Sequence, residues 1–271
     1  MPGLSNTEER MVDSPFGKPS APLVIGDLAG TRVVFLARHG IGHTISPSEI
    51  NYRANIYPLR SLGVERVVSI SACGSLREVY APGEIVIPDG LFDFTRDRKR
   101  SFFENGLVAH ISLPNPFCPD LSDQLRLAVQ KTGATIHNGG AFITIEGPRF
   151  STRTESNVFR SWGMAIIGMT TSPEAFLARE AEMCYTVMAH VTDFDVGHIS
   201  EKPVTVDMVV QTLHQNTRLA QEAILNLAAA LQSGRACACE QPLENALIPP
   251  RDSISAEARQ RLSLLVDKYL A

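Results

Sequence analysis

The chain has 271 residues, of which 44% are hydrophobic and 20% are charged, so it is long enough to bury a sizeable core in one large α/β domain. The formal net charge of -4 lacks the basic excess that nucleic-acid-binding proteins use to neutralise phosphates, although it allows a small anionic substrate. No apolar leader opens the chain, and no run is apolar and long enough to span a bilayer. With five scattered cysteines, these features predict a reduced cytoplasmic protein without nucleic-acid or membrane partners.

The first half of the chain predicts strands and one helix behind an irregular arm. Residues 1–20 are polar and contain Pro and Gly at several positions, which is typical of a loop. The elements expected after this arm are a strand pair at 23–25 and 32–36, a helix over 47–61, and buried strands at 66–71 and 84–88.

The second half repeats the alternation with longer helices. Helices are expected over 121–132, 152–161, 172–182, 206–231 and 255–270, and strands at 141–145, 165–167 and 184–191. Strands that alternate with helices predict an α/β fold with a mixed or parallel sheet. Residues 1–232 are expected to form the main domain, followed by a Pro-, Ala- and Cys-rich linker over 233–252 and a C-terminal helix within 253–271 that packs on the domain.

Several common catalytic motifs are absent from the sequence. It has no Gly-x-Gly-x-x-Gly turn opening a helix and no Walker loop, which argues against a Rossmann dehydrogenase and a P-loop NTPase. It has no His-Glu-x-x-His, no paired Cys-x-x-Cys and no Gly-x-Ser-x-Gly elbow, so neither a metal site nor a serine hydrolase is expected. The remaining candidates for chemistry are polar turns at the ends of predicted strands.

Three of these turns have the donors of an anion site. Arg38 and His39 follow a strand, where they can donate several hydrogen bonds to an oxyanion, and a solvated loop is an equally good interpretation. The stretch Ser-Ala-Cys-Gly-Ser at 71–75 can form a nest of backbone N–H groups, although an ordinary tight turn has the same composition. Thr170 comes just before a predicted helix N-terminus, whose free N–H groups favour a negative ligand, while Ser172 can also be a simple N-cap.

A fourth turn carries two acids, Asp193 and Asp195, directly after a strand. Side chains at i and i+2 of an extended segment project to the same side. In a pocket of low dielectric, one carboxyl can hold a proton and donate it to a ring nitrogen while its neighbour accepts from an amine. A solvated acidic loop and a metal site are the alternative interpretations of the same pair.

Five long motifs in a fixed order resemble one enzyme family. They are VDSPFGKPS (12–20), RHGIGHTISPSEINYRANI (38–56), SACGSLREVYAPGEIVIPDGLFDFT (71–95), ITIEGPRFSTRTES (143–156) and GMTTSPEAFLARE (168–180). Together they resemble the methylthioadenosine phosphorylases among the trimeric purine nucleoside phosphorylases. The resemblance implies a nucleoside phosphorylase-like α/β fold over 1–232, with a central mixed sheet flanked by helices. It also implies a homotrimeric pentosyltransferase that uses inorganic phosphate as co-substrate and needs no cofactor or metal.

The same resemblance implies roles for particular residues. The phosphate ligands are the side chains of Arg38, His39, Ser71 and Thr170 and the backbone of Ala72. The ribose and thioether end is met by Met169, Val206 and, from a neighbouring subunit, His110. The base lies near Phe150 and Phe194, and its edge is read by Ser151 and by the catalytic pair Asp193 and Asp195.

The implied reaction is the phosphorolysis of 5'-methylthioadenosine to adenine and 5-methylthioribose 1-phosphate, in purine and methionine salvage. The acid pair suits a 6-aminopurine because it accepts from N6 and donates to N7, whereas an acceptor aimed at a 6-oxo group leaves a buried polar group unpaired. A phosphorylase of broader specificity, acting on adenosine or inosine, is the near alternative. A non-catalytic nucleoside-binding homologue is the alternative from another class.

The sequence departs from the family pattern before Val12 and at Gly168. The family begins with a strand and a Gly-rich phosphate loop, and no such segment precedes Val12, which implies either a start set too late or a shortened and weakened enzyme. Loss of that strand exposes the edge of its neighbour and removes a phosphate donor. Gly168 stands where many relatives have Asn. Cys237 and Cys239 resemble a Cys-x-Cys of thermophilic relatives but are expected to be a reduced pair in a flexible linker.

Overall fold

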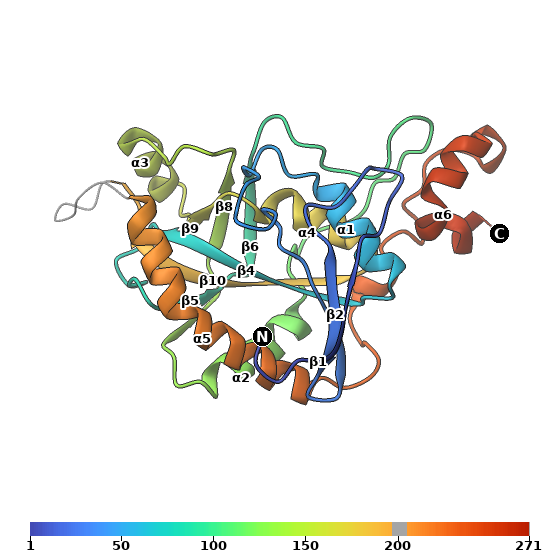
Figure 1. The fold of residues 1–271 in the computed structure, drawn as a ribbon. Helices are drawn as coiled ribbons and strands as arrows, with labels where there is room; N and C mark the ends of the chain where they lie inside the picture. The colour runs from blue at the N-terminus through green and yellow to red at the C-terminus, as the bar shows by residue number, and fades with distance from the viewer. Residues whose placement is uncertain (197–204, 271) are drawn as a thin grey trace.

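Seven strands form the central mixed sheet of the computed structural model, which describes residues 1–196 and 205–270 (Figure 1). Their order across the sheet is β6-β8-β9-β4-β10-β5-β7. The strands are β4 (Arg66–Ser75), β5 (Ile85–Ile87), β6 (Gly90–Phe94), β7 (Ile136–Asn138), β8 (Ala141–Ile145), β9 (Ile166–Gly168) and β10 (Cys184–Phe194). The α/β fold with a central mixed sheet, predicted from the sequence, is confirmed.

The two central strands, β4 and β10, run parallel, and their pairing positions the candidate site. The register runs from Arg66 opposite Cys184 and shifts near the end, so that Gly74 lies opposite Asp193. β10 is buried along almost its whole length, because elements pack on both faces of the sheet and its apolar run suits such a strand. The polar C-terminal residues of both strands therefore lie at the same edge of the sheet.

Helices pack on both faces of the sheet. They are α1 (Tyr52–Ser61), α2 (Pro119–Gln130), α3 (Arg153–Ser161), α4 (Thr171–Glu180), α5 (Val206–Ala230) and α6 (Ala256–Leu270). In Figure 1, α2 and α5 lie below the central strands, while α1 and α4 lie above them. The predicted apolar stripe of α2 is buried: Leu121, Leu125, Ala128 and Val129. Within the described ranges, no helix has the length and apolarity needed to cross a bilayer.

A second, antiparallel sheet contains β1 (Ser5–Arg10), β2 (Leu23–Leu28) and β3 (Thr31–Phe35). β2 and β3 are the predicted strand pair, joined by a two-residue turn in which Ala29 and Gly30 both have positive φ. The prediction of a loop throughout residues 1–20 is wrong, because it misses β1. All six residues of β1 are exposed, so no apolar alternation marks the strand, and it is defined by its backbone pairing with β2.

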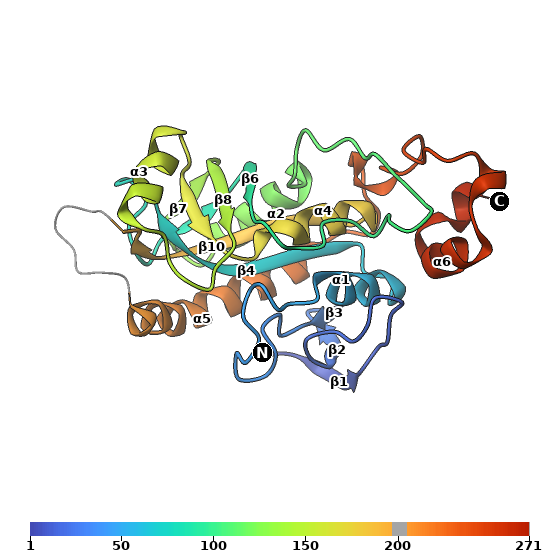
Figure 2. The same cartoon turned by 90° about the horizontal axis from the view of Figure 1, so that it is seen from above.

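Two strand edges line a groove of about 540 Å³. β3 forms one wall and the first part of β4 the other, with α1 and α5 contributing apolar residues. Figure 2 shows β3 and α1 on the same side of β4. Among the described residues, β3 pairs only with β2, and β4 meets β9 only at Gly74 and Ser75. The groove is therefore bordered by backbone edges that pair with no other described strand.

The segment predicted as a linker packs onto the domain. It contains two short 3₁₀ helices, η1 (Ala238–Glu240) and η2 (Arg251–Ser253), and buries Cys239, Leu243 and Ala246. Leu243 and Ala246 belong to the main hydrophobic core together with Leu262 and Val266 of α6. Buried apolar side chains thus anchor the C-terminal region to the domain, and the segment is not a free linker.

His190 on β10 is a buried titratable group with a clear expected effect on stability. It is 1% exposed, and neither ring nitrogen has a hydrogen-bond partner in the part of the chain that the structure describes. Burial lowers the pKa of His190 to about 4, below its ordinary value near 6.5. The unfolded chain therefore binds more protons between these two pH values, and stability is lost as the pH falls through that window.

We expect His190→Leu to raise the free energy of unfolding by about 1–3 kcal/mol at neutral pH, because it removes two buried polar atoms without partners. The variant should also lose less stability than the original protein between about pH 6.5 and pH 4. Urea denaturation at several pH values measures both effects. An unchanged pH slope for the His190 variant would contradict the prediction.

Candidate active site

Arg38 is the centre of the anion side of the candidate site. It follows β3, and its guanidinium reaches the middle of β4 and the start of α4. Nη1 donates to Thr170 Oγ1 at 3.2 Å, and Nη2 donates to the hydroxyl of Ser69. Ser69 in turn lies 3.0 Å from the hydroxyl of Ser71. The structure therefore brings together three of the residues that the sequence analysis assigns to phosphate, namely Arg38, Ser71 and Thr170.

Glu174 is a member of this cluster that sequence reasoning missed. Its carboxylate accepts from Nε of Arg38, and its Oε2 accepts from Arg38 Nη2 at 3.0 Å and from the Tyr185 hydroxyl at 2.8 Å. Burial opposes the charge of Arg38, but Glu174 together with Tyr185 and Tyr52 outweighs it, so the pKa of Arg38 is raised. In sequence, Glu174 looks like an ordinary acidic residue in the first turn of a helix. The ion pair holds the guanidinium in place for an anion.

His39 lies beside Arg38 on the wall of the groove. Its Nδ1 is 2.9 Å from the carbonyl of Ile45, which can only accept, so Nδ1 carries a proton and Nε2 is the acceptor of the neutral ring. Burial is the main cause that lowers the pKa of His39, and the stacked ring of His43 adds to it. His39 therefore suits an oxygen that brings a proton, as the phosphate monoanion does, or it takes up a proton when the dianion binds.

The two acids of β10 are buried, at 5% exposure for Asp193 and 4% for Asp195. The hydroxyl of Thr192 donates to Asp193 Oδ2 at 2.7 Å, and the hydroxyl of Ser156 on α3 donates to Asp195. Burial raises the pKa of Asp195, against the opposing effect of Ser156. The burial excludes the interpretation of a solvated acidic loop. In the described ranges these acids join no third metal-ligating side chain, so the metal interpretation gains no support.

The anion cluster and the acid pair are separated along β4. Ser71 and Gly74 are three residues apart on this strand, which is about 10 Å at about 3.3 Å per residue. Gly74 lies directly opposite Asp193 in the register. This spacing leaves room for a sugar ring between a phosphate at Arg38 and a purine at Asp193. The side chains could thus contact both ends of a nucleoside.

Gly74 allows the close approach of the acid pair to β4. A Cβ at this position would lie 3.1 Å from Asp193 Oδ1 and from Ile167 Cγ2, and 3.2 Å from Asp195 Cβ. We expect Gly74→Ala to cost about 1–3 kcal/mol of stability through overpacking. Displacement of Asp193 should lower kcat/KM for the nucleoside by about tenfold or more, because misplaced catalytic groups lose rate steeply.

Gly90→Ala is the matched control for this variant. Gly90 also lies in a strand, and a Cβ there would be 3.5 Å from Ala141 Cα, an ordinary contact. Thermal unfolding and steady-state rates of both variants should be compared with those of the original protein. Equal rates for the two variants would show that Asp193 does not depend on the space at Gly74.

The other residues that are predicted to contact the substrate differ in how deeply they are buried. Ser151 is buried and its hydroxyl has no hydrogen-bond partner in residues 1–196 and 205–270, so it is available to a ligand. Phe150 is 37% exposed and Val206 is 66% exposed, while Phe194 is half-buried at the end of β10.

Ala72 lies on β4 opposite His190. His110 is exposed beside the C-terminal region and donates from its backbone to Ala246, outside the groove of this chain.

Gly168 is packed so closely against Phe142 that a side chain has no room. A Cβ at Gly168 would lie 2.7 Å from Cζ of Phe142, so this ring occupies the space that an Asn side chain would need. The neighbouring Met169 packs with the hydrophobic cluster of β8, β9 and α3, and its sulfur would be 2.6 Å from a Cβ on Gly147. Phe142 thus fills the space beside Gly168.

Arg98 is a buried positioning residue that the sequence analysis also missed. It donates to the carbonyls of Met169 at 2.6 Å, Ser172 at 2.7 Å and Glu146 at 2.6 Å. These bonds tie the loop after β8 to the start of α4, which carries Thr170 and Glu174. Arg98 lies in the charged run RDRKR, which in sequence resembles a solvated surface loop.

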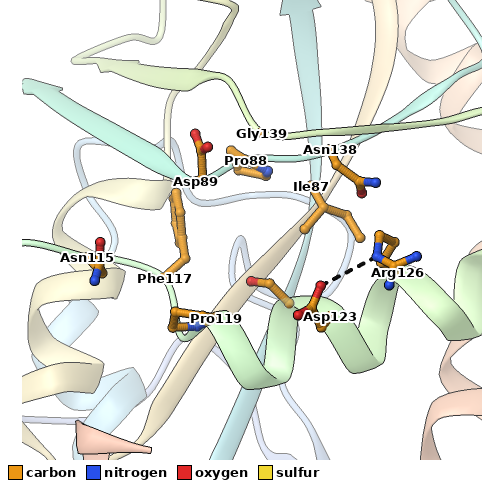
Figure 3. A pocket seen from close by; sticks show the side chains of 11 residues that line it. Ile87, Pro88, Asp89, Asn115, Phe117, Pro119, Asp123, Arg126, Asn138 and Gly139 are labelled. Atoms are coloured by element: carbon orange, nitrogen blue, oxygen red, sulfur yellow. Dashed lines mark hydrogen bonds and ion pairs between the residues drawn. The ribbon is translucent and has the colours of Figure 1, made fainter.

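A second hollow of about 260 Å³ lies elsewhere on the molecule, between the ends of β5 and β7 and the first turns of α2 (Figure 3). Asp123 and Arg126 of α2 form an ion pair at its rim, 3.4 Å apart. None of the residues that the sequence analysis assigns to the site lines this hollow. Arg38 and His39 line the groove between β3 and β4, so that groove is the better candidate for the anion.

Known proteins resemble the whole chain. Residues 2–231 match the family described as the phosphorylase superfamily. The S-methyl-5'-thioadenosine phosphorylase of Geobacter sulfurreducens is 48% identical over 271 residues, which cover 100% of this chain and 95% of the relative. A methylthioadenosine phosphorylase from an antarctic soil metagenomic library has a crystal structure that matches with a TM-score of 0.94 and 42% identity, covering 98% of this chain and 94% of that one.

A more distant structure is similar over the same length. The methylthioadenosine phosphorylase of Schistosoma mansoni in complex with adenine matches with a TM-score of 0.84 and 32% identity, covering 98% of this chain and 95% of that chain. The fold, with its polar cluster at the edge of the central sheet, is that of a phosphorylase. The chain belongs to the phosphorylase superfamily, among relatives named S-methyl-5'-thioadenosine phosphorylase.

Proposed function

We propose that this chain catalyses the phosphorolysis of 5'-methylthioadenosine to adenine and 5-methylthioribose 1-phosphate, as a pentosyltransferase of purine and methionine salvage. The single observation that carries the proposal is the buried Asp193 and Asp195 pair, held about 10 Å along β4 from the Arg38 cluster. At this distance, the Arg38 cluster can bind the phosphate at the sugar end of the nucleoside while the two acids bind its purine. The relatives named for this activity cover the whole chain.

On the anion side, phosphate binds to Arg38, His39 and Thr170, with Ser71 and the backbone of Ala72 at its far side. Glu174 keeps the guanidinium of Arg38 oriented, so little conformational entropy is lost when phosphate binds. The bound anion approaches C1' of the ribose and stabilises the positive charge that develops on the sugar. Phosphate is the co-substrate, and the proposed reaction needs no organic cofactor.

On the base side, the leaving purine must not carry away a full negative charge. Asp193 holds or shares a proton at N7. The carboxylate that remains ionised accepts a hydrogen bond from the exocyclic amine. Ser151 offers a free hydroxyl, and Phe150 and Phe194 provide apolar surface for the ring. A 6-oxopurine would turn an acceptor toward the acids, which leaves buried groups unpaired and lowers its rate.

The assembly that we propose is a homotrimer in the cytoplasm. His110 is exposed on its own chain, as the proposed contact with a neighbouring site requires. Met169 and Val206 would meet the same end of the substrate from within the chain. The aliphatic and thioether groups there need apolar contact and no charge.

The test compares substrates with and without phosphate. Purified protein is incubated with 5'-methylthioadenosine, adenosine or inosine, and release of the free base is followed by chromatography. We expect phosphate-dependent release from 5'-methylthioadenosine and at least tenfold lower kcat/KM for inosine. Equal or better use of inosine would overturn the role of the acid pair. Binding of adenine nucleosides without any turnover would favour the non-catalytic alternative.

A further inference from the structure

Four of the five cysteines gather in one cluster far from the candidate active site. The sulfurs of Cys118, Cys184, Cys237 and Cys239 all lie within 4.8 Å of one another, and the four side chains are free thiols. The sulfurs of Cys184 and Cys237 are 3.3 Å apart. Cys184 begins β10 and Asp193 is nine residues further along, about 30 Å at about 3.3 Å per residue. The cluster therefore belongs to a separate site.

Three distant parts of the chain supply these thiols from well-fixed backbone. Cys118 caps the N-terminus of α2, and its N–H donates to the carbonyl of Tyr185 at 2.8 Å. The N–H of Cys184 donates to Glu65 at 2.8 Å. Cys237 caps η1, which contains Cys239. Three of the four side chains are almost completely buried and Cys237 is partly buried, so the cluster is shielded from water but keeps one entry path.

Positive charge surrounds the cluster. The guanidinium of Arg235, whose side chain is 5% exposed, lies against the sulfur of Cys184. Arg179 is buried and lies within electrostatic reach of Cys239. The N-terminus of α2 adds its unpaired N–H groups beside Cys118. Arg235 also lies 3.8 Å from a carboxylate oxygen of Glu65 and 3.9 Å from one of Glu240. Cations placed beside the sulfurs favour thiolates over neutral thiols.

We propose that the four cysteines form a structural zinc site with four thiolate ligands. A tetrahedron with Zn–S bonds of about 2.3 Å places its sulfurs about 3.8 Å apart, which lies within the range that the cluster already spans. Each thiol releases its proton to solvent as its bond to zinc forms, and no oxidant or reductant is needed. Four thiolates around Zn²⁺ carry a net charge of about -2, which the two arginines complement.

The site would fix the segment between α5 and α6 to the sheet. Cys237 and Cys239 lie on this segment, while Cys118 and Cys184 belong to α2 and β10. Two disulfides could join the same residues in pairs, but pairing does not require that all four sulfurs converge on one point. A zinc ion requires that convergence, and it binds the folded chain far better than the unfolded one.

The test measures the metal content of the full-length protein without an affinity tag, grown with added zinc and purified under reducing conditions without chelator. Elemental analysis should find about one zinc per chain in the original protein. The double variant Cys237→Ser/Cys239→Ser should retain less than a tenth of that content. Cys73→Ser is the matched control, because Cys73 is buried but lies outside the cluster, and it should keep its zinc.

Cobalt gives a readout that does not depend on the folding of any variant. Metal-free original protein titrated with Co²⁺ should reach saturation at about one equivalent and show the visible bands of tetrahedral cobalt with thiolate-to-metal charge transfer. Purified protein with negligible zinc and five titratable thiols would overturn the proposal. Disulfides among the four cysteines, an iron content in place of zinc, or the weak spectrum of octahedral cobalt would overturn it as well.

Discussion

Replacing Asp193 by asparagine is expected to lower kcat for 5'-methylthioadenosine by about 10²–10⁴-fold, the range of a lost general acid. Asparagine keeps the size of the side chain and can still accept from Thr192, so the fold should be retained. The amide cannot supply a proton to N7, and the purine must then leave with more negative charge. Its N–H group can instead donate to a 6-oxo oxygen, so the ratio of inosine to methylthioadenosine rates should rise.

Steady-state rates with both nucleosides at saturating phosphate measure this change. Asp123→Asn on α2 is the matched control, because it makes the same chemical change at an exposed position away from the groove. The control should keep rates close to those of the original protein. A variant at Asp193 with unchanged kcat and unchanged substrate preference would show that the acid pair neither protonates nor reads the base.

Replacing Arg38 by methionine is expected to raise KM for phosphate by about 10–100-fold, the value of a charge-assisted hydrogen bond of about 1.5–3 kcal/mol. The same variant leaves Glu174 buried without its cation, so the free energy of unfolding should fall by about 3–5 kcal/mol. The two effects have different causes. The loss of phosphate affinity follows from the missing guanidinium, and the loss of stability follows from the unpaired carboxylate.

A double variant separates the two causes. Arg38→Met/Glu174→Gln removes the unpaired charge, so it should recover most of the stability while the KM for phosphate stays high. Arg32→Met is the control on the neighbouring strand, because Arg32 is 51% exposed and its ion pairs contribute little. Urea denaturation and phosphate titration supply the two readouts. If the double variant regains normal phosphate affinity, Arg38 does not hold the anion.

The sequence predicted the elements that bury apolar side chains in a regular pattern. The stripe of α2 and the buried run of β10 lie where the periodicity placed them, because both follow from burial against the sheet. β1 was missed because all of its side chains are exposed, and only its backbone pairing with β2 reveals it. Periodicity carries no signal for such a strand.

The convergence of the anion residues could be expected only in part. Arg38 and Thr170 stand at the ends of predicted strands, and strand ends at one edge of a sheet meet in space. Glu174 and Arg98 act by long-range contacts to Arg38 and to backbone carbonyls, which local sequence does not encode. The cysteine cluster combines positions 118, 184, 237 and 239, and no local spacing predicts it beyond the Cys-x-Cys pair.

The most direct measurement is the identity of the sugar product. Phosphorus NMR of a reaction with 5'-methylthioadenosine and inorganic phosphate should show a sugar 1-phosphate that grows in step with free adenine. This result requires that a bound phosphate attacks the nucleoside held at the acid pair. Adenine released with no new phosphate ester, or at a rate that does not depend on phosphate, would contradict the joint site of Arg38 and Asp193.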